Sequence, residues 1–326
     1  MKFPRRRFLH LAAGAAALPA ISRVAMAQIY PTRPITMIVP FAAGGGTDVS
    51  ARIVSEHMSR TLGQQIVVEN IAGAGGTTGS IRAMRANPDG YTIEMGQMGT
   101  HASAVAFYPN LAYKPDVDFA PISLVVWVPQ MIVARKDFPP KDLKEFVPYV
   151  KANPQKLNMA HAGVGSIGYT GGLLLNSILG VTPTLIPFNG AAPAINALIG
   201  GQVDYMCDAA INSASHVQSG AIKAYMIDAE RRNPMLPNVP TSKEAGLPEF
   251  QVLSWVALFA PKETPKPILD VLTDALDKAL DDQNVRRQFL DLINEIPDKA
   301  SRGQQPLAGL VKSEVARWTR IIKGTK

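Results

Sequence analysis

The chain is almost without cysteine, since Cys207 is the only one among its 326 residues. A single thiol excludes an intrachain disulfide framework, a thiolate zinc site and a Cys-x-x-Cys redox centre. Cys207 lies in an apolar segment, so we predict a buried and unreactive thiol. The sequence also lacks, after residue 27, any run of 18 uninterrupted apolar residues. We therefore expect a mature chain without a membrane-spanning helix, soluble after processing.

Acidic residues are missing from the first 27 positions, where the net charge of +7 is concentrated. This segment carries five basic residues, and removing them from the 33 in the chain leaves 28 against 26 acidic residues. The remainder is close to neutral. The overall basicity therefore gives no reason to expect a nucleic-acid partner.

The same N-terminal segment has the three parts of an export signal. Arg5-Arg6-Arg7-Phe8-Leu9 is followed by an alanine-rich apolar stretch to Ile21 and by the small-x-small sequence Ala25-Met26-Ala27. A basic start, a short apolar core and small residues at the cleavage site are typical of signal peptides, and the arginine pair of the twin-arginine type. We predict a signal peptide at residues 1–27 and a periplasmic mature protein that begins near Gln28.

Sequence patterns of common catalytic sites are also absent. There is no His-Glu-x-x-His metal motif, no Gly-x-Ser-x-Gly nucleophile turn and no Gly-Lys-Ser/Thr phosphate loop. We therefore expect no metal site and no enzyme activity. One alternative stays open, because the turn Gly73–Gly79 follows an apolar segment as a dinucleotide-binding turn does, with Thr78 in place of the third glycine. That alternative is an exported oxidoreductase that binds a nucleotide cofactor.

What the sequence does contain is an alternation of short apolar runs and helical patterns. This alternation predicts an α/β fold built on mostly parallel sheets. We expect strands at residues 35–40, 65–69, 91–95, 157–160, 184–187, 203–207 and 221–227, and a segment at 124–133 that crosses between two lobes. Apolar stripes with helical spacing predict two helices near the C-terminus.

Two glycine-rich turns, Phe41–Asp48 and Gly73–Gly79, each follow a predicted strand and open a predicted helix. Such turns point backbone N–H groups and a helix N-terminus at a bound anion, and neither contains Lys or Arg. We expect Thr47 or Asp48 to cap the first helix. Asp48 has two possible roles, capping with an ion pair to Arg52 or direct ligand contact, and the sequence leaves both open.

Strand ends that resemble each other suggest two similar lobes around a cleft. The first glycine-rich turn follows Ile38-Val39-Pro40-Phe41, and Leu185-Ile186-Pro187-Phe188 repeats that ending about 147 residues later. Proline has no N–H to donate and ends a strand in the same way in both places.

Longer motifs resemble the Bug-type solute receptors, the extracytoplasmic binding proteins of tripartite tricarboxylate transporters. The resemblance covers the mature chain in order. It rests on Pro34-Ile35-x-x-Ile38-Val39-Pro40-Phe41-x-x-Gly44-Gly45-x-x-Asp48-x-x-Ala51-Arg52, Val68-Glu69-Asn70-x-x-Gly73-Ala74-Gly75-Gly76, Pro88-Asp89-Gly90-Tyr91-Thr92, Gly190-Ala191-Ala192-Pro193-Ala194, Gly200-Gly201-Gln202-Val203-Asp204 and Val239-Pro240-Thr241-x-x-Glu244-Ala245-Gly246.

The resemblance implies a two-lobed type II periplasmic-binding-protein fold with a ligand cleft and two crossing strands. We expect one lobe at 28–128 plus 252–326 and the other at 129–251. It further implies a monomeric receptor without cofactor. Such a receptor captures a small organic carboxylate (a dicarboxylate, tricarboxylate or aromatic acid) and passes it to membrane transporter subunits or to a sensor.

Ligand contacts are expected from several loops at the cleft. The predicted ligand-binding residues are Phe41, Ala43, Gly44, Gly45, Asp48, Gly75, Thr100, His101, Ser166, Tyr169, Thr170, Asn189 and Asp208. The chain departs from the family at two of these places. Family members often have His where this chain has Tyr169, and Tyr-Lys or Tyr-Arg where it has Phe188-Asn189. The missing positive charge disfavours a highly charged ligand such as citrate.

Overall fold

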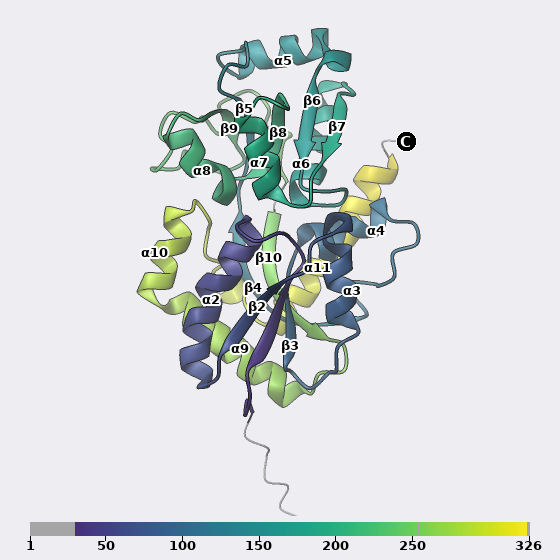
Figure 1. Cartoon of the computed structure of the whole chain (residues 1–326), viewed down its shortest axis with the longest axis vertical. Helices are drawn as coiled ribbons and strands as arrows, with labels where there is room; N and C mark the ends of the chain where they lie inside the picture. Colours follow the sequence, from purple (N-terminus) through teal and green to yellow (C-terminus); the bar gives the residue numbers. More distant parts are fainter. Residues whose placement is uncertain (1–29, 253, 325–326) are drawn as a thin grey trace, which may run out of the picture.

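The computed structural model describes residues 30–252 and 254–324, so the predicted signal peptide at 1–27 lies outside the described residues. The chain folds into two lobes, and each is built on a five-stranded mixed sheet with helices on both faces (Figure 1). We call the lobe with the first strands lobe 1 and the other lobe 2. The α/β, two-lobed architecture is the predicted one.

The sheet of lobe 1 has the strand order β2-β1-β3-β10-β4. Its strands are β1 (Ile35–Val39), β2 (Ile66–Asn70), β3 (Thr92–Gln97), β4 (Phe119–Val128) and β10 (Ser254–Pro261). β1 is parallel to β2 and β3, whereas β10 is antiparallel to β3 and β4. β1 is apolar apart from Thr36, as is typical of a strand in a sheet that helices cover on both faces.

Helices from both ends of the chain cover the sheet of lobe 1 (Figure 1). One face carries α2 (Gly46–Leu62), α9 (Lys266–Asp281) and α10 (Gln283–Asp291), and the other carries α3 (Thr77–Met84) and α11 (Gln304–Gly324). The predicted apolar stripe in α9 consists of Ile268, which is half-buried, and of Leu272, Ala275 and Ala279, which are buried. Short helical turns η1 (Ala74–Gly76), η2 (Gly99–Ser103), α4 (Ala104–Phe107) and η4 (Lys299–Ser301) complete the lobe.

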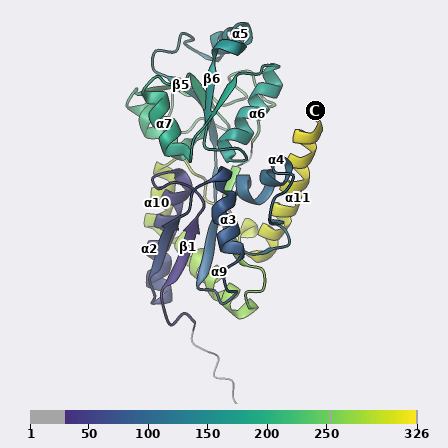
Figure 2. The same ribbon diagram turned by 45° about the vertical axis from the view of Figure 1, so that its right-hand side comes forward.

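The sheet of lobe 2 has the order β7-β6-β8-β5-β9. Its strands are β5 (Gln130–Arg135), β6 (Asn158–His161), β7 (Thr184–Pro187), β8 (Tyr205–Ala209) and β9 (Ile222–Ile227). On one face lie α5 (Leu143–Ala152) and α6 (Ile167–Leu179), and on the other α7 (Ala191–Ile199) and α8 (Ala210–Gln218), with a short turn η3 (Pro154–Lys156) after α5. Figure 2 shows this lobe stacked on lobe 1, with α11 running up beside it.

The chain passes between the lobes twice. The first passage is at Pro129, which separates β4 from β5, and the second lies between β9 and β10. The predicted crossing at 124–133 is therefore confirmed, although it consists of two strands. β10 was not predicted as a strand, yet it is buried along its whole length and lies between β3 and β4 in the lobe 1 sheet.

Over residues 30–252 and 254–324, no helix has the length and the apolar character that crossing a bilayer requires.

Candidate functional site

Two neighbouring cavities lie between the lobes. The smaller, of about 40 Å³, is lined by the start of α2 and Gln97 from lobe 1, and by residues around Ser166 and Asp208 from lobe 2. The larger, of about 400 Å³, is lined by Phe41, residues 73–76 and Tyr108 from lobe 1, and by residues 162–164 and 187–189 from lobe 2. Phe41 and Ala162 line both. The cavities therefore adjoin, and each is lined by residues of both lobes.

The start of α2 forms one wall of the smaller cavity. Gly45 is the N-cap residue and has no side chain to cap with, so the prediction that Thr47 or Asp48 caps this helix is wrong. The first N–H groups of a helix have no acceptor within it and carry its positive dipole end. Gly45, Gly46 and Thr47 line the cavity. This wall is suited to an anion although it has no basic side chain.

Asp48 supports this loop from behind. Its carboxylate accepts hydrogen bonds from the Gly44 amide at 2.9 Å and from Asn70 Nδ2 at 3.0 Å, and it pairs with Arg52 at 3.0 Å. Burial alone would raise the pKa of Asp48, but Arg52, Gly44 and Asn70 together hold it below its ordinary value. Its acceptor sites are thus taken by the protein, and the structure favours a supporting role over ligand contact.

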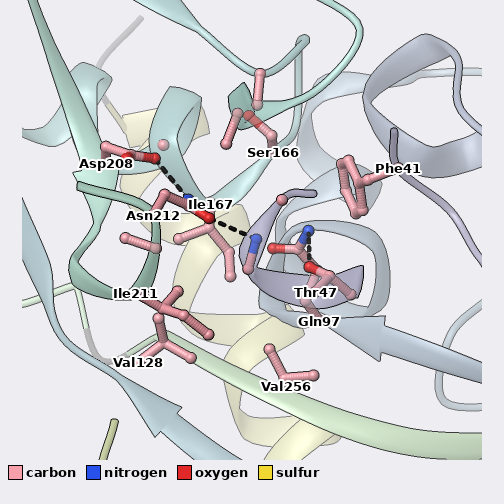
Figure 3. A pocket seen from close by; sticks show the side chains of 16 residues that line it. Phe41, Thr47, Gln97, Val128, Ser166, Ile167, Asp208, Ile211, Asn212 and Val256 are labelled. Atoms are coloured by element: carbon pink, nitrogen blue, oxygen red, sulfur yellow. Dashed lines mark hydrogen bonds between the residues drawn. The ribbon is translucent and has the colours of Figure 1, made fainter. Parts of the chain in front are cut away.

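A hydrogen-bond chain joins the lobes across the smaller cavity (Figure 3). Asn212, from α8, accepts a hydrogen bond from the Gly46 amide and donates one to Asp208 at 2.9 Å. A Cβ atom on Gly46 would clash with Ile211 and Asn212. Glycine at position 46 is therefore what allows lobe 2 to approach the N-terminus of α2.

Asp208 is the one charged residue among the described residues that line the smaller cavity. It is 3% exposed and accepts hydrogen bonds from Ser213 and Asn212. Burial raises its pKa to about 6, although these two donors and the Ala209 amide oppose the shift. At neutral pH it is therefore a carboxylate held by neutral donors.

Backbone from the two lobes meets at the rim of the larger cavity. Gly75 has φ 64°, and a Cβ atom there would clash with the Val164 carbonyl. The single phenol proton of Tyr108 is shared between Ala74 O, at 2.9 Å in lobe 1, and Val164 O, at 2.6 Å in lobe 2. Glycine and a single phenol thus hold the rims together.

A second polar contact between the lobes lies deeper. Ser103 Oγ and Thr170 Oγ1 are 3.0 Å apart, and Ser103 also donates to Gly165 O at 3.3 Å. Thr170 is therefore part of the interface between the lobes. Ser166 caps α6 by accepting from the Tyr169 amide at 3.2 Å, and it lines the smaller cavity.

Thr100 and His101 lie in the core of lobe 1, and neither is among the residues that line the two cavities. Thr100 Oγ1 bonds to the backbone of Gln97, which does line the smaller cavity, and to His101 Nδ1 at 2.9 Å. The His101 ring stacks on Phe259 with a centroid distance of 3.8 Å. The structure thus places both residues one layer behind the cavity wall.

His101 Nε2 faces Glu94 Oε2 at 3.9 Å, and neither atom has a hydrogen-bond partner within residues 30–252 and 254–324. Although the distance is within range of an ion pair, burial raises the pKa of Glu94 to about 8 and lowers that of His101 to about 3. Both groups are completely buried, so we regard the pair as neutral at pH 7.

The remaining predicted residues lie at different depths. Asn189 is exposed and lines the larger cavity, whereas Ala43 and Gly44 are exposed and line neither cavity. Tyr169 packs between Phe107 and His161. Ligand contact by any of these residues stays a prediction.

Several lining residues were not predicted: Gln97, Tyr108, Phe188 and Asn212. For Phe188 a signal existed, since the two matching Pro-Phe strand ends place Phe41 and Phe188 at the same cavity from opposite lobes. Asn212 follows Asp208 by four residues, but the sequence does not show that Asn212 accepts a hydrogen bond from a backbone amide of the other lobe. No cluster of three or more metal-ligating side chains occurs in the part of the chain that the structure describes.

Comparison with known proteins gives one consistent result. Residues 50–326 match the model of the tripartite tricarboxylate transporter family receptor. A protein encoded in the TAR-I ttuE–ttuC′ intergenic region of Agrobacterium vitis is 40% identical over 97% of this chain and 90% of its own length. Protein BugT of Bordetella pertussis is 32% identical over 95% of this chain and 94% of its own.

Solved structures agree. MatC from Rhodopseudomonas palustris, with bound malate, superposes with a TM-score of 0.87 at 49% identity, over 90% of this chain and 100% of its own. The periplasmic binding protein BugD has a TM-score of 0.87 at 43% identity, over 91% of this chain and 98% of its own. A Rhodopseudomonas palustris protein solved with adipate has a TM-score of 0.86 at 29% identity, over 91% of this chain and 98% of its own. None of these comparisons supports the alternative of a nucleotide-dependent oxidoreductase.

Proposed function

The chain belongs to the tripartite tricarboxylate transporter family of receptors, and on that premise we propose that it captures a small organic carboxylate between its lobes. It is a solute-binding receptor and not an enzyme, as the family is. Relatives were solved with malate and with adipate, so carboxylate is the chemistry that we carry over.

The observation that supports this proposal is the wall formed by Gly45, Gly46 and Thr47. In this protein the Gly46 amide is bonded to the side-chain oxygen of Asn212. We propose that a ligand carboxylate binds beside this position and accepts from the free amides of the first helical turn. Ser166, from the N-terminus of α6, faces the same cavity from lobe 2.

A thermal-shift screen tests the proposal. The panel contains malate, adipate, citrate and benzoate, with the dimethyl ester of malate as an uncharged control. A ligand present at 100 times its dissociation constant adds about 2.7 kcal/mol to the free energy of unfolding. We expect at least one acid, and not the ester, to raise the melting temperature. If none of a broad set of organic acids does so, the proposed function is wrong.

We also propose that the protein acts in the periplasm, as a monomer, and delivers its ligand to membrane transporter subunits or to a sensor. The support is the signal pattern at residues 1–27 and the periplasmic assignment of BugD. Replacing Arg5, Arg6 and Arg7 by Lys is expected to retain the precursor in the cytoplasm, as followed by cell fractionation. Unchanged export would exclude the twin-arginine route.

A further inference from the structure

A third cavity lies where the chain crosses between the lobes. Its volume is about 300 Å³, at the lower end of the range for small-molecule sites. Lobe 1 contributes Trp127, Ser254 and Glu295 to its wall, and the segment that follows β9 contributes residues 228–230. Of the described residues that line it, only Val128 also lines a cavity of the cleft. The third cavity is therefore a separate compartment, and nothing in the proposed function uses it.

Acidic side chains outnumber basic ones in this wall. Among the described residues that line the cavity, Asp228, Glu230 and Glu295 are acidic and Lys243 is the only basic one, which gives a formal charge of −2. Lys243 lies 3.8 Å from Glu230, so these two charges offset each other. The other two acidic residues come from opposite sides, Glu295 from lobe 1 and Asp228 from the end of β9. The excess of negative charge favours a cation in this cavity and disfavours an organic acid.

Glu295 is held beside the ring of Trp127. The backbones of these two residues exchange two hydrogen bonds, at 2.9 and 3.0 Å, in an antiparallel bridge. Residues paired in this way point their side chains to the same face of the sheet, with Cβ atoms about 5 Å apart. The Glu295 carboxylate has no hydrogen bond or ion pair to another residue within 30–252 and 254–324. A carboxylate next to an indole face is a suitable environment for an ammonium group, because both attract positive charge.

Ser254 adds a buried polar group to the same wall. It is 3% exposed, and its hydroxyl has no hydrogen-bond partner in the part of the chain that the structure describes. Buried hydroxyl groups normally have a partner, and an ammonium N–H would supply a donor to this oxygen. A metal ion fits less well, since residues 30–252 and 254–324 contain no group of three or more metal-ligating side chains.

We propose that this third cavity binds a small organic ammonium ion. Its ammonium group lies between the Glu295 carboxylate and the ring of Trp127. Its alkyl part packs against Pro129 and Pro248, which also line the cavity. The site takes a ligand of opposite charge to the one proposed for the cleft, and it does not depend on the proposed function.

Fluorescence quenching of the purified protein tests the site. The chain has three tryptophans, and Trp255 and Trp318 are at most 1% exposed, so quenching by acrylamide reports mainly on Trp127. We expect putrescine to protect Trp127 from acrylamide. The control is the diol analogue, in which hydroxyl groups replace both amines, and calorimetry should show that putrescine binds at least tenfold more tightly. If putrescine leaves quenching unchanged, or binds no more tightly than the diol, the proposed site is wrong.

Two matched substitutions test the position of the ammonium group. Glu295→Gln removes the charge beside Trp127 and keeps the size of the side chain, so putrescine affinity should fall at least fivefold. Glu263→Gln removes the same charge from the exposed loop between β10 and α9, which lines none of the three cavities, and should leave affinity unchanged. Melting temperatures show whether each variant is folded. Equal effects of the two substitutions, or no effect of Glu295→Gln, would contradict the placement. Because no organic acid is used, failure of the acid screen would not alter these results.

Discussion

At the scale of single residues, Gly46 leaves no room for a side chain at the start of α2. Its missing Cβ leaves space for Ile211 and Asn212 of lobe 2. Gly46→Ala keeps a good helix residue at the start of α2 but forces the lobes apart. We expect ligand affinity to fall at least about fivefold, because overpacking typically costs about 1–3 kcal/mol. Calorimetry with the acid identified in the screen measures the loss.

Gly309→Ala is the control for this substitution. Gly309 lies in α11, where an added Cβ would have no neighbour within 4 Å. Affinity should stay unchanged in this variant, and stability should rise slightly. If Gly46→Ala binds as tightly as the control, close approach of lobe 2 to α2 is not needed for binding.

The buried pair Glu94 and His101 makes stability depend on pH. Burial raises the pKa of Glu94 from 4.5 to about 8, so the folded protein keeps a proton that the unfolded chain has released. The contribution of Glu94 to stability therefore falls as pH rises from 4.5 to about 8. His101, with its pKa lowered from 6.5 to about 3, acts in the opposite direction but only below pH 6.5. Asp208, raised to about 6, also acts at lower pH. Between pH 6.5 and 8, Glu94 is thus the main contributor of the three.

Glu94→Gln tests this assignment, since the amide stays neutral and keeps a donor toward His101. Between pH 6.5 and 8, the wild-type protein should lose stability relative to the variant. The loss should approach about 1.4 kcal/mol per pH unit if a full proton is involved. Urea unfolding at intervals of half a pH unit gives the difference. Parallel stability curves for the two proteins would mean that Glu94 is ionised in the folded state.

The sequence predicts the roles of some single residues correctly and those of others incorrectly. Cys207 is buried, as its apolar segment indicated, and burial raises the pKa of its thiol well above the ordinary value. Thr100 and His101 were assigned to the site by family resemblance, but the structure places them behind the wall formed by Gln97. Motif position shows which loop a residue belongs to. It does not show on which side of that loop the side chain lies.

At the scale of elements, α6 packs on its sheet through glycines on one face. An added Cβ on Gly171 would lie 2.5 Å from Cys207 Sγ, and one on Gly172 would meet the flexible end of Met159. Because Cys207 is short and confined, Gly171→Ala should destabilise the protein by about 1–3 kcal/mol, and Gly172→Ala by less. Urea unfolding of both variants measures the difference.

A double-mutant cycle then identifies the cause. Cys207→Ala removes the sulfur that Gly171→Ala would meet, so the two substitutions together should cost less than the sum of their separate costs. Additive costs would show that the loss at position 171 does not come from this contact.

Most elements followed from apolar patterns in the sequence. The strand predicted at 184–187 matches β7, and the strand predicted at 157–160 matches β6 to within one residue at each end. β10 was missed because its hydrogen-bonding partners are more than 120 residues away in the sequence. The predicted lobe limits, 28–128 plus 252–326 and 129–251, stay a proposal.

At the scale of the whole molecule, Tyr108 links the rims of the two lobes. Its phenol is within hydrogen-bond distance of Ala74 O in lobe 1 and Val164 O in lobe 2. Tyr108→Phe keeps the ring at the cavity and removes the link. One hydrogen bond contributes about 1 kcal/mol, so we expect about a fivefold loss of affinity through a smaller closed population.

Small-angle scattering with and without ligand measures this effect, because an open protein has a larger radius of gyration. The free variant should be more open than the free wild-type protein, and both should close with saturating ligand. If the two free proteins have the same radius and the same affinity, the phenol does not contribute to closure.

The position of β10 in the lobe 1 sheet also sets the order in which the lobes can form. All five strands of lobe 2 come from residues 130–227, so its sheet can pair as soon as that continuous stretch has been synthesised. The sheet of lobe 1 cannot be completed until residues 254–261 have been synthesised, because they form the strand between β3 and β4. Until then both neighbours expose unpaired edges, which are the sites where partly folded chains associate. The lobe that begins first along the chain is therefore the last to be completed.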